Sequence, residues 1–193
     1  MGYSFFAFIN RMKYIQRWGL MRSMVPENLQ EHCLQTAMIA HMLVKIDNKF
    51  YGGSLDPEKA CVYALYHDAT ETITGDLPTP VKYFNEELRE NYRVVEDMAS
   101  KRLVEMLPDD FRKDFEEIIE YEKNDEQYVP YVKAADKISA YFKCIEEENC
   151  GNKEFGAAKK TLSDIIGGME MPCVKYFMEN FAPAYLLSLD ELQ

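Results

Sequence analysis

Apolar residues recur at intervals of three and four along most of this chain, the spacing that gathers them on one face of an α-helix. No segment shows the sustained alternation of apolar and polar residues that is typical of a strand. The pattern predicts helices over residues 4–17, 26–50, 57–71, 85–107, 109–121, 127–149, 153–166 and 171–181. We therefore expect an all-α helical bundle, organised as a single domain over residues 1–193.

Residue types that begin and end helices punctuate this pattern. Ser4 and the pair Asp56-Pro57 suit helix starts, and Gly19 suits a helix stop. In the long amphipathic segment over 85–107, one stripe is expected to be buried. Its members are Leu88, Tyr92, Val95, Met98, Ala99, Leu103 and Met106.

Composition and net charge limit the kinds of molecule that the protein is expected to bind. Apolar residues make up 47% of the 193 residues, enough for a sizeable core, so disorder is not expected. The formal net charge of −11 disfavours binding to nucleic-acid polymers and to anionic membranes, which both need basic surfaces. A small anionic substrate remains compatible, because a few local cations or a metal ion can reverse the field inside a pocket.

Cysteine usage and the absence of a long apolar stretch indicate the cellular compartment of the protein. The five cysteines are odd in number and form no Cys-x-x-Cys pair, which favours reduced thiols. The early apolar run 5–9 is short and is followed at once by Arg11 and Lys13, unlike a signal peptide. No stretch approaches the ~20 apolar residues that cross a bilayer. We expect a soluble, cytoplasmic protein.

The stretch from Tyr66 to Tyr83 carries unusual chemistry for an otherwise apolar segment. It places His67 and Asp68 side by side after an apolar run, with Glu71 one helical turn later. In a continuous helix His67 and Glu71 would share a face, and Asp68 would flank it. The Thr-Gly-Asp-Leu-Pro turn that follows could form one wall of a site.

Two other predicted helices could supply partners. His32 and His41 lie nine residues apart, so they point to opposite faces and cannot bind one metal ion together. His41 has no supporting neighbours and is interpreted as a structural residue. Asp136 lies in an apolar, alanine-rich helix, where a carboxylate is costly to bury unless it is paired or bound to metal. An ion pair with Lys133 is the alternative for Asp136.

His32, His67, Asp68 and Asp136 are thus four candidate metal ligands from three helices. Two imidazoles and two carboxylates suit manganese, iron, cobalt, nickel or zinc better than magnesium or calcium. A six-coordinate ion held by four side chains keeps two positions for water or substrate, as catalysis requires.

Arg17 and Trp18, at the end of the first predicted helix, allow two interpretations. The only tryptophan of the chain is most simply a packing anchor beside an arginine. Alternatively, its ring could stack on a planar ligand while the guanidinium holds an anion.

The arrangement His32…His67-Asp68…Asp136 on helices resembles the HD-domain superfamily of metal-dependent phosphohydrolases. It is most similar to the YfbR-type 5′-deoxynucleotidases of bacteria. The similar blocks cover nearly the whole chain, and the middle one is highly specific. They are FINRMKYIQRWGLMR, ENLQEHCLQTAMIAH, YHDATETITGDLPTPVKYFN, VKAADKISAYFKCIEE and NFAPAYLLSLDE.

The resemblance implies a homodimer that removes the 5′-phosphate from deoxyribonucleoside monophosphates with one divalent metal ion, commonly cobalt or manganese. It implies that His32, His67, Asp68 and Asp136 bind the metal, with His32 also beside the substrate. Glu71 matches the catalytic carboxylate, and Arg17 the arginine that orients the phosphate. Trp18 and the turn Asp76, Leu77, Pro78 and Thr79 match substrate-binding positions.

Three rival interpretations follow from the same residues. The first is another HD-domain phosphohydrolase, acting on nucleoside triphosphates, cyclic nucleotides or (p)ppGpp; His41 alone cannot complete a histidine-rich site for two metals. The second is a metal-stabilised module that binds nucleotides without turning them over, although Glu71 beside the ligands argues for proton transfer. The third is a purely structural helical protein in which these residues form core pairs.

Overall fold

The computed structural model describes residues 2–82 and 84–192. Regular structure in these residues consists of α-helices and 3-10 turns, apart from one antiparallel bridge between Gln16 and Asn28. The all-α prediction is confirmed. The helices are α1 (Phe5–Ile9), α2 (Leu29–Phe50), α3 (Pro57–Tyr66), α4 (Glu71–Thr74), α5 (Thr79–Lys82), α6 (Glu86–Glu105), α7 (Asp109–Ile119), α8 (Tyr121–Asn124), α9 (Val129–Asn149), α10 (Gly156–Gly167) and α11 (Pro172–Asn180).

The 3-10 turns continue or connect these helices. They are η1 (Asn10–Tyr14), η2 (Glu126–Tyr128), η3 (Lys153–Phe155), η4 (Ala182–Leu186) and η5 (Leu189–Leu192). No helix in 2–82 or 84–192 combines the length and the apolar character that a membrane span requires. All five cysteines are free thiols.

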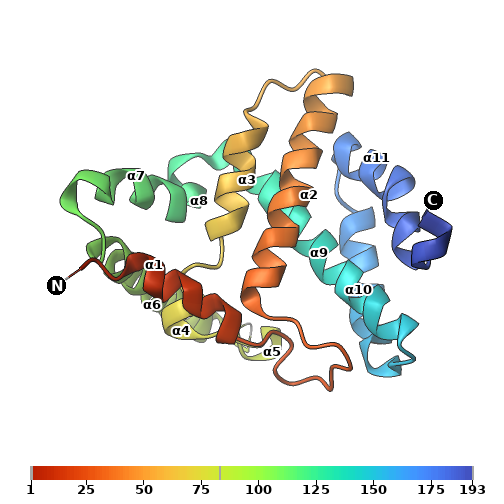
Figure 1. Ribbon diagram of the computed structural model, residues 1–193, viewed down its shortest axis with the longest axis horizontal. Coiled ribbons are helices and arrows are strands. Elements are labelled where there is room, and N and C mark those ends of the chain that lie inside the picture. Colours follow the sequence, from red (N-terminus) through yellow and green to blue (C-terminus); the bar gives the residue numbers. More distant parts are fainter. Residues whose placement is uncertain (1, 83, 193) are drawn as a thin grey trace.

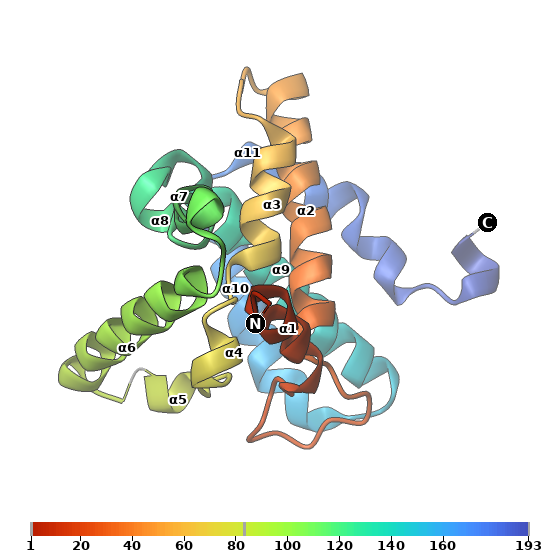
Figure 2. The same ribbon diagram turned by 60° about the vertical axis from the view of Figure 1, so that its left-hand side comes forward.

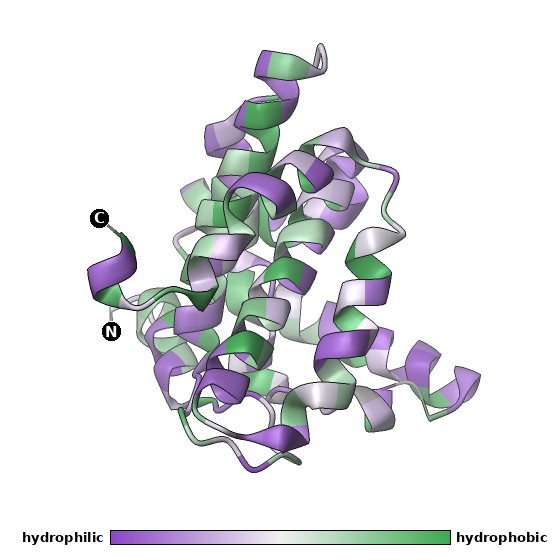
Figure 3. Cartoon of the chain, turned by 90° about the vertical axis from the view of Figure 1, so that its right-hand side faces the viewer, coloured by the Kyte–Doolittle hydropathy of each residue, from purple (hydrophilic) through white to green (hydrophobic). Residues whose placement is uncertain are grey.

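Helix α2 is the centre of the bundle, with α3, α9 and α11 packed around it (Figure 1). It begins at a capping box, in which Asn28 and Glu31 each bond the other's backbone N–H. Its inward face carries Leu43 and Val44, which are fully buried, and the main apolar cluster joins it to α3, α9 and α11. Green and purple segments alternate along the helices in Figure 3, as amphipathic helices require.

The first helix is shorter than predicted. It tightens into η1 and ends at Tyr14, because Ile15 turns to an extended conformation. Backbone bonds from Arg17 N–H to the Glu27 carbonyl and from Leu29 N–H to the Ile15 carbonyl then tie this segment to the start of α2. The segment that carries Arg17 is therefore non-helical backbone held on both sides.

Helix α6 departs from the predicted buried stripe. Ala99 and Leu103 are buried, as expected, but Val95 and Met98 are exposed, with Met98 66% accessible. In Figure 2 the first turns of α6 extend beyond the bundle together with α5. The last turns of the chain, around η5, also extend away from the bundle.

Candidate metal centre

Three candidate ligands converge at the point where the start of α2 meets the end of α3. One atom each from His32, His67 and Asp68 lies within 4.8 Å of the other two. Nε2 of His67 is 3.2 Å from Asp68 Oδ2, and Nε2 of His32 is 3.8 Å from the same oxygen. The imidazole rings lie 5.3 Å apart between centroids. Residues 35 positions apart in the sequence thus present two nitrogens and a carboxylate to one point.

His67 and Asp68 lie in a turn and not on one face of a helix. Helix α3 ends at Tyr66, and the turn is closed by bonds from Ala69 N–H to the Tyr66 carbonyl and from Glu71 N–H to the Asp68 carbonyl. Glu71 then begins the short helix α4. The expectation of one continuous helix over 57–71 is therefore wrong. The break lets adjacent residues, His67 and Asp68, aim at the same point.

Hydrogen bonds hold each imidazole by its Nδ1 atom. Nδ1 of His67 lies 2.7 Å from the Ala64 carbonyl oxygen, which can only accept, so Nδ1 carries a proton. Nδ1 of His32 lies 3.1 Å from Ser139 Oγ. Both Nε2 atoms are buried and, among the described residues, neither has a hydrogen-bond partner. Buried orphan nitrogens facing a carboxylate fit a divalent cation.

Asp136, on α9, lies on the other side of His32. Its Oδ1 is 3.1 Å from His32 Nε2, and its Oδ2 accepts a bond of 2.8 Å from Lys137. The alternative pairing with Lys133 is not formed, because Lys133 pairs with Glu122. Asp136 therefore contacts the site through His32, outside the group of three that lies within 4.8 Å.

Burial and neighbouring charges shift the pKa values of Asp68, His67 and His32. Burial opposes ionisation of Asp68, but His67 and His32 outweigh burial and hold the pKa of Asp68 below its ordinary value. Burial also opposes protonation of His67, yet Asp68 raises the pKa of His67. Burial lowers the pKa of His32. A cation that binds here must therefore displace a proton from His67, as is usual for histidine ligands.

Arg17 reaches this cluster from the irregular segment before α2. Its Nη1 is 3.6 Å from Asp68 Oδ2, and its Nε donates to Glu27 Oε2 at 3.2 Å. Burial opposes the charge of Arg17, but Asp68 and Asp136 outweigh burial and raise the pKa of Arg17. The guanidinium is thus fixed, charged and directed at the carboxylate side of the site.

Trp18 has the left-handed backbone conformation, with φ of 60°. Its Nε1 donates to Glu27 Oε2 at 2.9 Å, and its ring packs against Phe155, with ring centroids 5.1 Å apart. The contact with Phe155 matches the packing interpretation of this residue. The strained backbone is stabilised by these two side-chain contacts.

Two residues that hold the Arg17 segment were missed from the sequence. Glu27 bonds both Arg17 and Trp18, and nothing in its sequence neighbourhood distinguishes it from a surface glutamate. Glu147 belongs to the acidic run 146–148, which is typical of a solvated helix end, yet it is fully buried. It accepts bonds from the backbone N–H groups of Met24 and Val25 and from Lys143. Only tertiary structure identifies such roles.

Glu71 and Asp76 are two further half-buried carboxyl groups whose charges interact with the charge of Arg17. Burial raises the pKa of Glu71 to about 9, and the charges of Asp68 and Asp76 add to the rise. Its Oε2 atom is buried, and no hydrogen-bond partner for it lies in the described part of the chain. Burial also raises the pKa of Asp76, against the opposing charge of Arg17.

The rest of the predicted substrate turn follows Asp76 directly. Leu77 and Pro78 are half-buried, and Thr79 begins α5. The side chain of Thr79 lies outside the described part of the structure. The turn adjoins Glu71 through Gly75, whose φ of 75° lets the backbone leave α4 sharply.

The arrangement combines the parts that hydrolysis of a phosphate ester requires. It has nitrogen and oxygen ligands for a cation, a fixed guanidinium, and a carboxyl group, Glu71, that is neutral at pH 7 and can donate a proton. His41, interpreted from the sequence as a structural residue, lies elsewhere: its Nε2 is 3.7 Å from Glu58.

Comparison with known proteins agrees with this geometry. The chain matches the family model described as 5′-deoxynucleotidase YfbR-like over residues 4–185. It is 48% identical to a protein of Vibrio parahaemolyticus named 5′-deoxynucleotidase, over 97% of each chain. A solved HD-domain phosphohydrolase of Listeria innocua matches with a TM-score of 0.83 and 24% identity, covering 98% of this chain and 92% of that one.

A second solved structure contains a metal ion. It is the HD phosphohydrolase DatZ of cyanophage S-2L, bound to dA and one catalytic Zn²⁺, with a TM-score of 0.66 and 18% identity over 93% of this chain and 95% of that one. The two structural matches establish the shared fold, and the sequence matches establish the family. This chain belongs to the YfbR-like 5′-deoxynucleotidase family.

Proposed function

We propose that this protein is a metal-dependent 5′-deoxynucleotidase, which hydrolyses deoxyribonucleoside 5′-monophosphates to deoxyribonucleosides and phosphate. The observation that carries the proposal is the convergence of two orphan imidazole nitrogens and Asp68 within 4.8 Å, beside the guanidinium of Arg17. The activity named for the relative that shares 48% of its residues is of this kind.

We assign His32, His67, Asp68 and Asp136 as the residues that would hold one divalent cation. Such a cation supplies charge for the phosphate oxygens and lowers the pKa of a coordinated water. The mixed nitrogen and oxygen donors suit cobalt or manganese, and iron, nickel and zinc are compatible. The Zn²⁺ in the cyanophage enzyme of the same fold supports a single-ion site.

Arg17 is assigned to orient the phosphate. Glu27 holds its Nε, and the two terminal nitrogens, of which Nη1 lies 3.6 Å from Asp68 Oδ2, would bind two phosphate oxygens in a fork. Trp18 and the turn of Asp76, Leu77, Pro78 and Thr79 would contact the sugar and base, with His32 at the phosphate end. An aromatic ring stacks on any base, so broad base preference is expected.

Glu71 is assigned as the group that gives a proton to the departing 5′ oxygen. A carboxyl that is neutral at pH 7 has this proton available, and its raised pKa follows from burial and from two neighbouring carboxylates. Phosphomonoester hydrolysis is among the slowest uncatalysed reactions, so both charge neutralisation and proton transfer are needed to reach biological rates.

The activity is tested with a phosphate-release panel. We expect release from deoxyribonucleoside monophosphates with Co²⁺ or Mn²⁺, slower release from the matching ribonucleotides, and none from triphosphates. Treatment with a chelator should abolish release, and added metal should restore it. A metal-loaded protein that releases no phosphate from any monophosphate would contradict the proposal and favour a binding module.

The fourth ligand is tested by Asp136→Ala. Because the carboxylate contacts His32 Nε2, its loss should weaken affinity for Co²⁺ at least tenfold and lower turnover, without unfolding the protein. The matched control is Asp164→Ala, which removes an exposed carboxylate paired with Lys160. Titration calorimetry measures both affinities. Native metal affinity in Asp136→Ala would remove Asp136 from the ligand set.

The role of Glu71 is tested by Glu71→Gln, which keeps the size of the side chain but cannot transfer a proton. We expect turnover to fall about 100-fold or more with metal content unchanged. Since the neutral form donates, wild-type activity should decline as pH rises toward about 9, and somewhat earlier when a cation offsets Asp68. That alkaline decline should be absent from the variant. A variant with a near-native rate would exclude Glu71 from proton transfer.

We also propose that the protein is a cytoplasmic homodimer. Exposed apolar side chains support a partner surface, among them Met98 and Leu189, and the free cysteines suit a reducing compartment. Sedimentation equilibrium should give twice the 22.5 kDa chain mass. A single-chain mass, or recovery with membranes on cell fractionation, would contradict this assignment.

A further inference from the structure

The orientation of His32 depends on a chain of other side chains. Its Nδ1 lies 3.1 Å from Ser139 Oγ, and Ser139 Oγ donates to Gln35 Oε1 at 2.7 Å. His32 and Ser139 are both fully buried, so solvent does not compete for the bond between them. For His67 the equivalent bond is to a backbone carbonyl, which no side-chain motion can remove.

The direction of these bonds decides where the proton of His32 lies. Ser139 has a single hydroxyl hydrogen, and this hydrogen is directed at Gln35 Oε1. The hydroxyl oxygen must therefore accept from Nδ1–H of His32. A neutral imidazole carries one N–H, so Nε2 keeps its lone pair free.

The opposite arrangement is within reach and would disable the ligand. Asp136 Oδ1 lies 3.1 Å from Nε2 and would accept a proton placed there. If the Ser139 hydroxyl turned its hydrogen toward Nδ1, the imidazole proton would move to Nε2, facing Asp136. A metal ion would then have to displace that proton. The acceptor oxygen of Gln35 disfavours this state by occupying the hydroxyl hydrogen.

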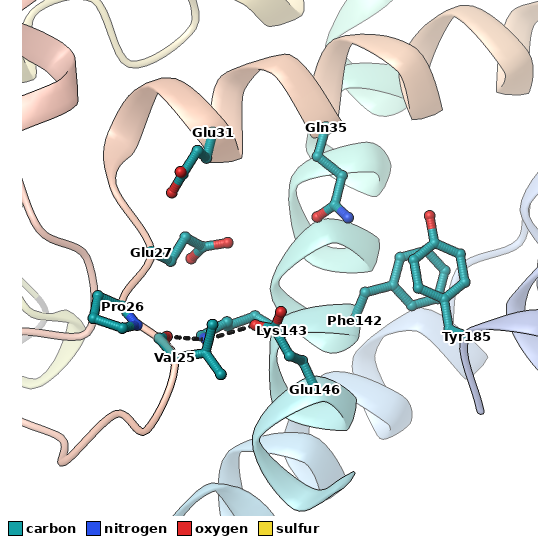
Figure 4. Close-up of a pocket in the computed structure, with 9 residues that line it drawn as sticks. All are labelled: Val25, Pro26, Glu27, Glu31, Gln35, Phe142, Lys143, Glu146 and Tyr185. Atoms are coloured by element: carbon teal, nitrogen blue, oxygen red, sulfur yellow. Dashed lines mark hydrogen bonds and ion pairs between the residues drawn. The ribbon is translucent and has the colours of Figure 1, made fainter. Parts of the chain in front are cut away.

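Gln35 lies at the wall of a cavity of about 310 Å³ (Figure 4). Phe142 and Tyr185 line the same cavity, with their rings stacked at 3.5 Å between centroids. The Gln35 amide presents its oxygen, Oε1, to the Ser139 hydroxyl.

We propose that Ser139 and Gln35 are positioning residues that hold His32 as its Nδ1–H tautomer and so keep Nε2 available to the metal ion. This inference rests on the metal site of the proposed function. It assigns neither residue a contact with substrate. Its consequence is that the two residues control metal affinity while lying behind the ligand.

Four variants test the proposal. Ser139→Ala removes the acceptor of the Nδ1 proton, and Gln35→Leu removes the acceptor of the hydroxyl hydrogen at a half-buried position that tolerates change. Gln35→Glu keeps an acceptor oxygen. Thr36→Val is the matched control, because Thr36 carries a fully buried hydroxyl on the same helix whose oxygen has no hydrogen-bond partner in the described structure.

The first readout is affinity for Zn²⁺. Ser139→Ala and Gln35→Leu should weaken it about 10-fold to 100-fold, as loss of such supporting bonds does in other metal sites. Gln35→Glu should restore most of it, and Thr36→Val should leave it unchanged. Native affinity in both Ser139→Ala and Gln35→Leu would overturn the proposal.

The second readout needs no metal and is therefore independent of the proposed function. The chain has three histidines, so nitrogen-15 correlation spectra of the metal-free protein can be assigned by substitution. We expect Nδ1–H for His32 in the wild-type protein and in Thr36→Val, and a shift toward Nε2–H in Ser139→Ala. An Nε2–H tautomer in the wild-type protein would refute the proposal even if metal-dependent phosphate release were confirmed.

Discussion

The structure depends on two imidazoles that are each held by Nδ1, so that both Nε2 atoms face a carboxylate, Asp136 beside His32 and Asp68 beside His67. In the described part of the chain neither buried Nε2 atom makes a hydrogen bond, which typically costs about 1–3 kcal/mol for each unsatisfied atom, and a cation between the nitrogens and the carboxylates would remove that cost. The arrangement is held in place because α2 and α3 pack along a shared apolar face, which fixes His32 and His67 to the same rigid core. Core packing therefore sets the geometry of the metal centre, and the turn after α3 adds Asp68.

A second buried constraint couples the fold to the segment that carries Arg17. Glu147 and Lys143 lie one turn apart on α9, both buried, with the ammonium 2.8 Å from the carboxylate. The pair also bonds the backbone at Met24 and Val25, so it fixes the segment that leads from Trp18 to α2. Removing one partner of a buried pair typically costs about 3–5 kcal/mol, far more than a surface contact. The segment carrying Arg17 is irregular but not free to move.

Most of the fold could be predicted from the sequence because its helices are long and amphipathic and have clear caps. The start of α3 follows directly from the predicted cap Asp56, whereas α2 begins at Leu29, three residues after its predicted start. The errors occur where tertiary contacts override the local pattern. Residues 15–17 pair with the start of α2 instead of continuing a helix, and the helix expected over 57–71 breaks at His67. Local spacing does not encode these contacts.

The candidate ligands were recognisable because histidine and aspartate are conspicuous in apolar helices, whereas their supporting residues were not. Ser139, Gln35 and Glu27 are ordinary residue types whose roles exist only through contacts across the bundle.

The charges around Arg17 bear on why a cation would be needed at this centre. The carboxylates of Glu27, Asp68 and Asp136 act on the guanidinium of Arg17. Arg17 and Lys137 offset part of this negative charge, in a protein of net charge −11. A divalent cation bound at the proposed site would add positive charge at this point and so would favour a phosphate dianion there.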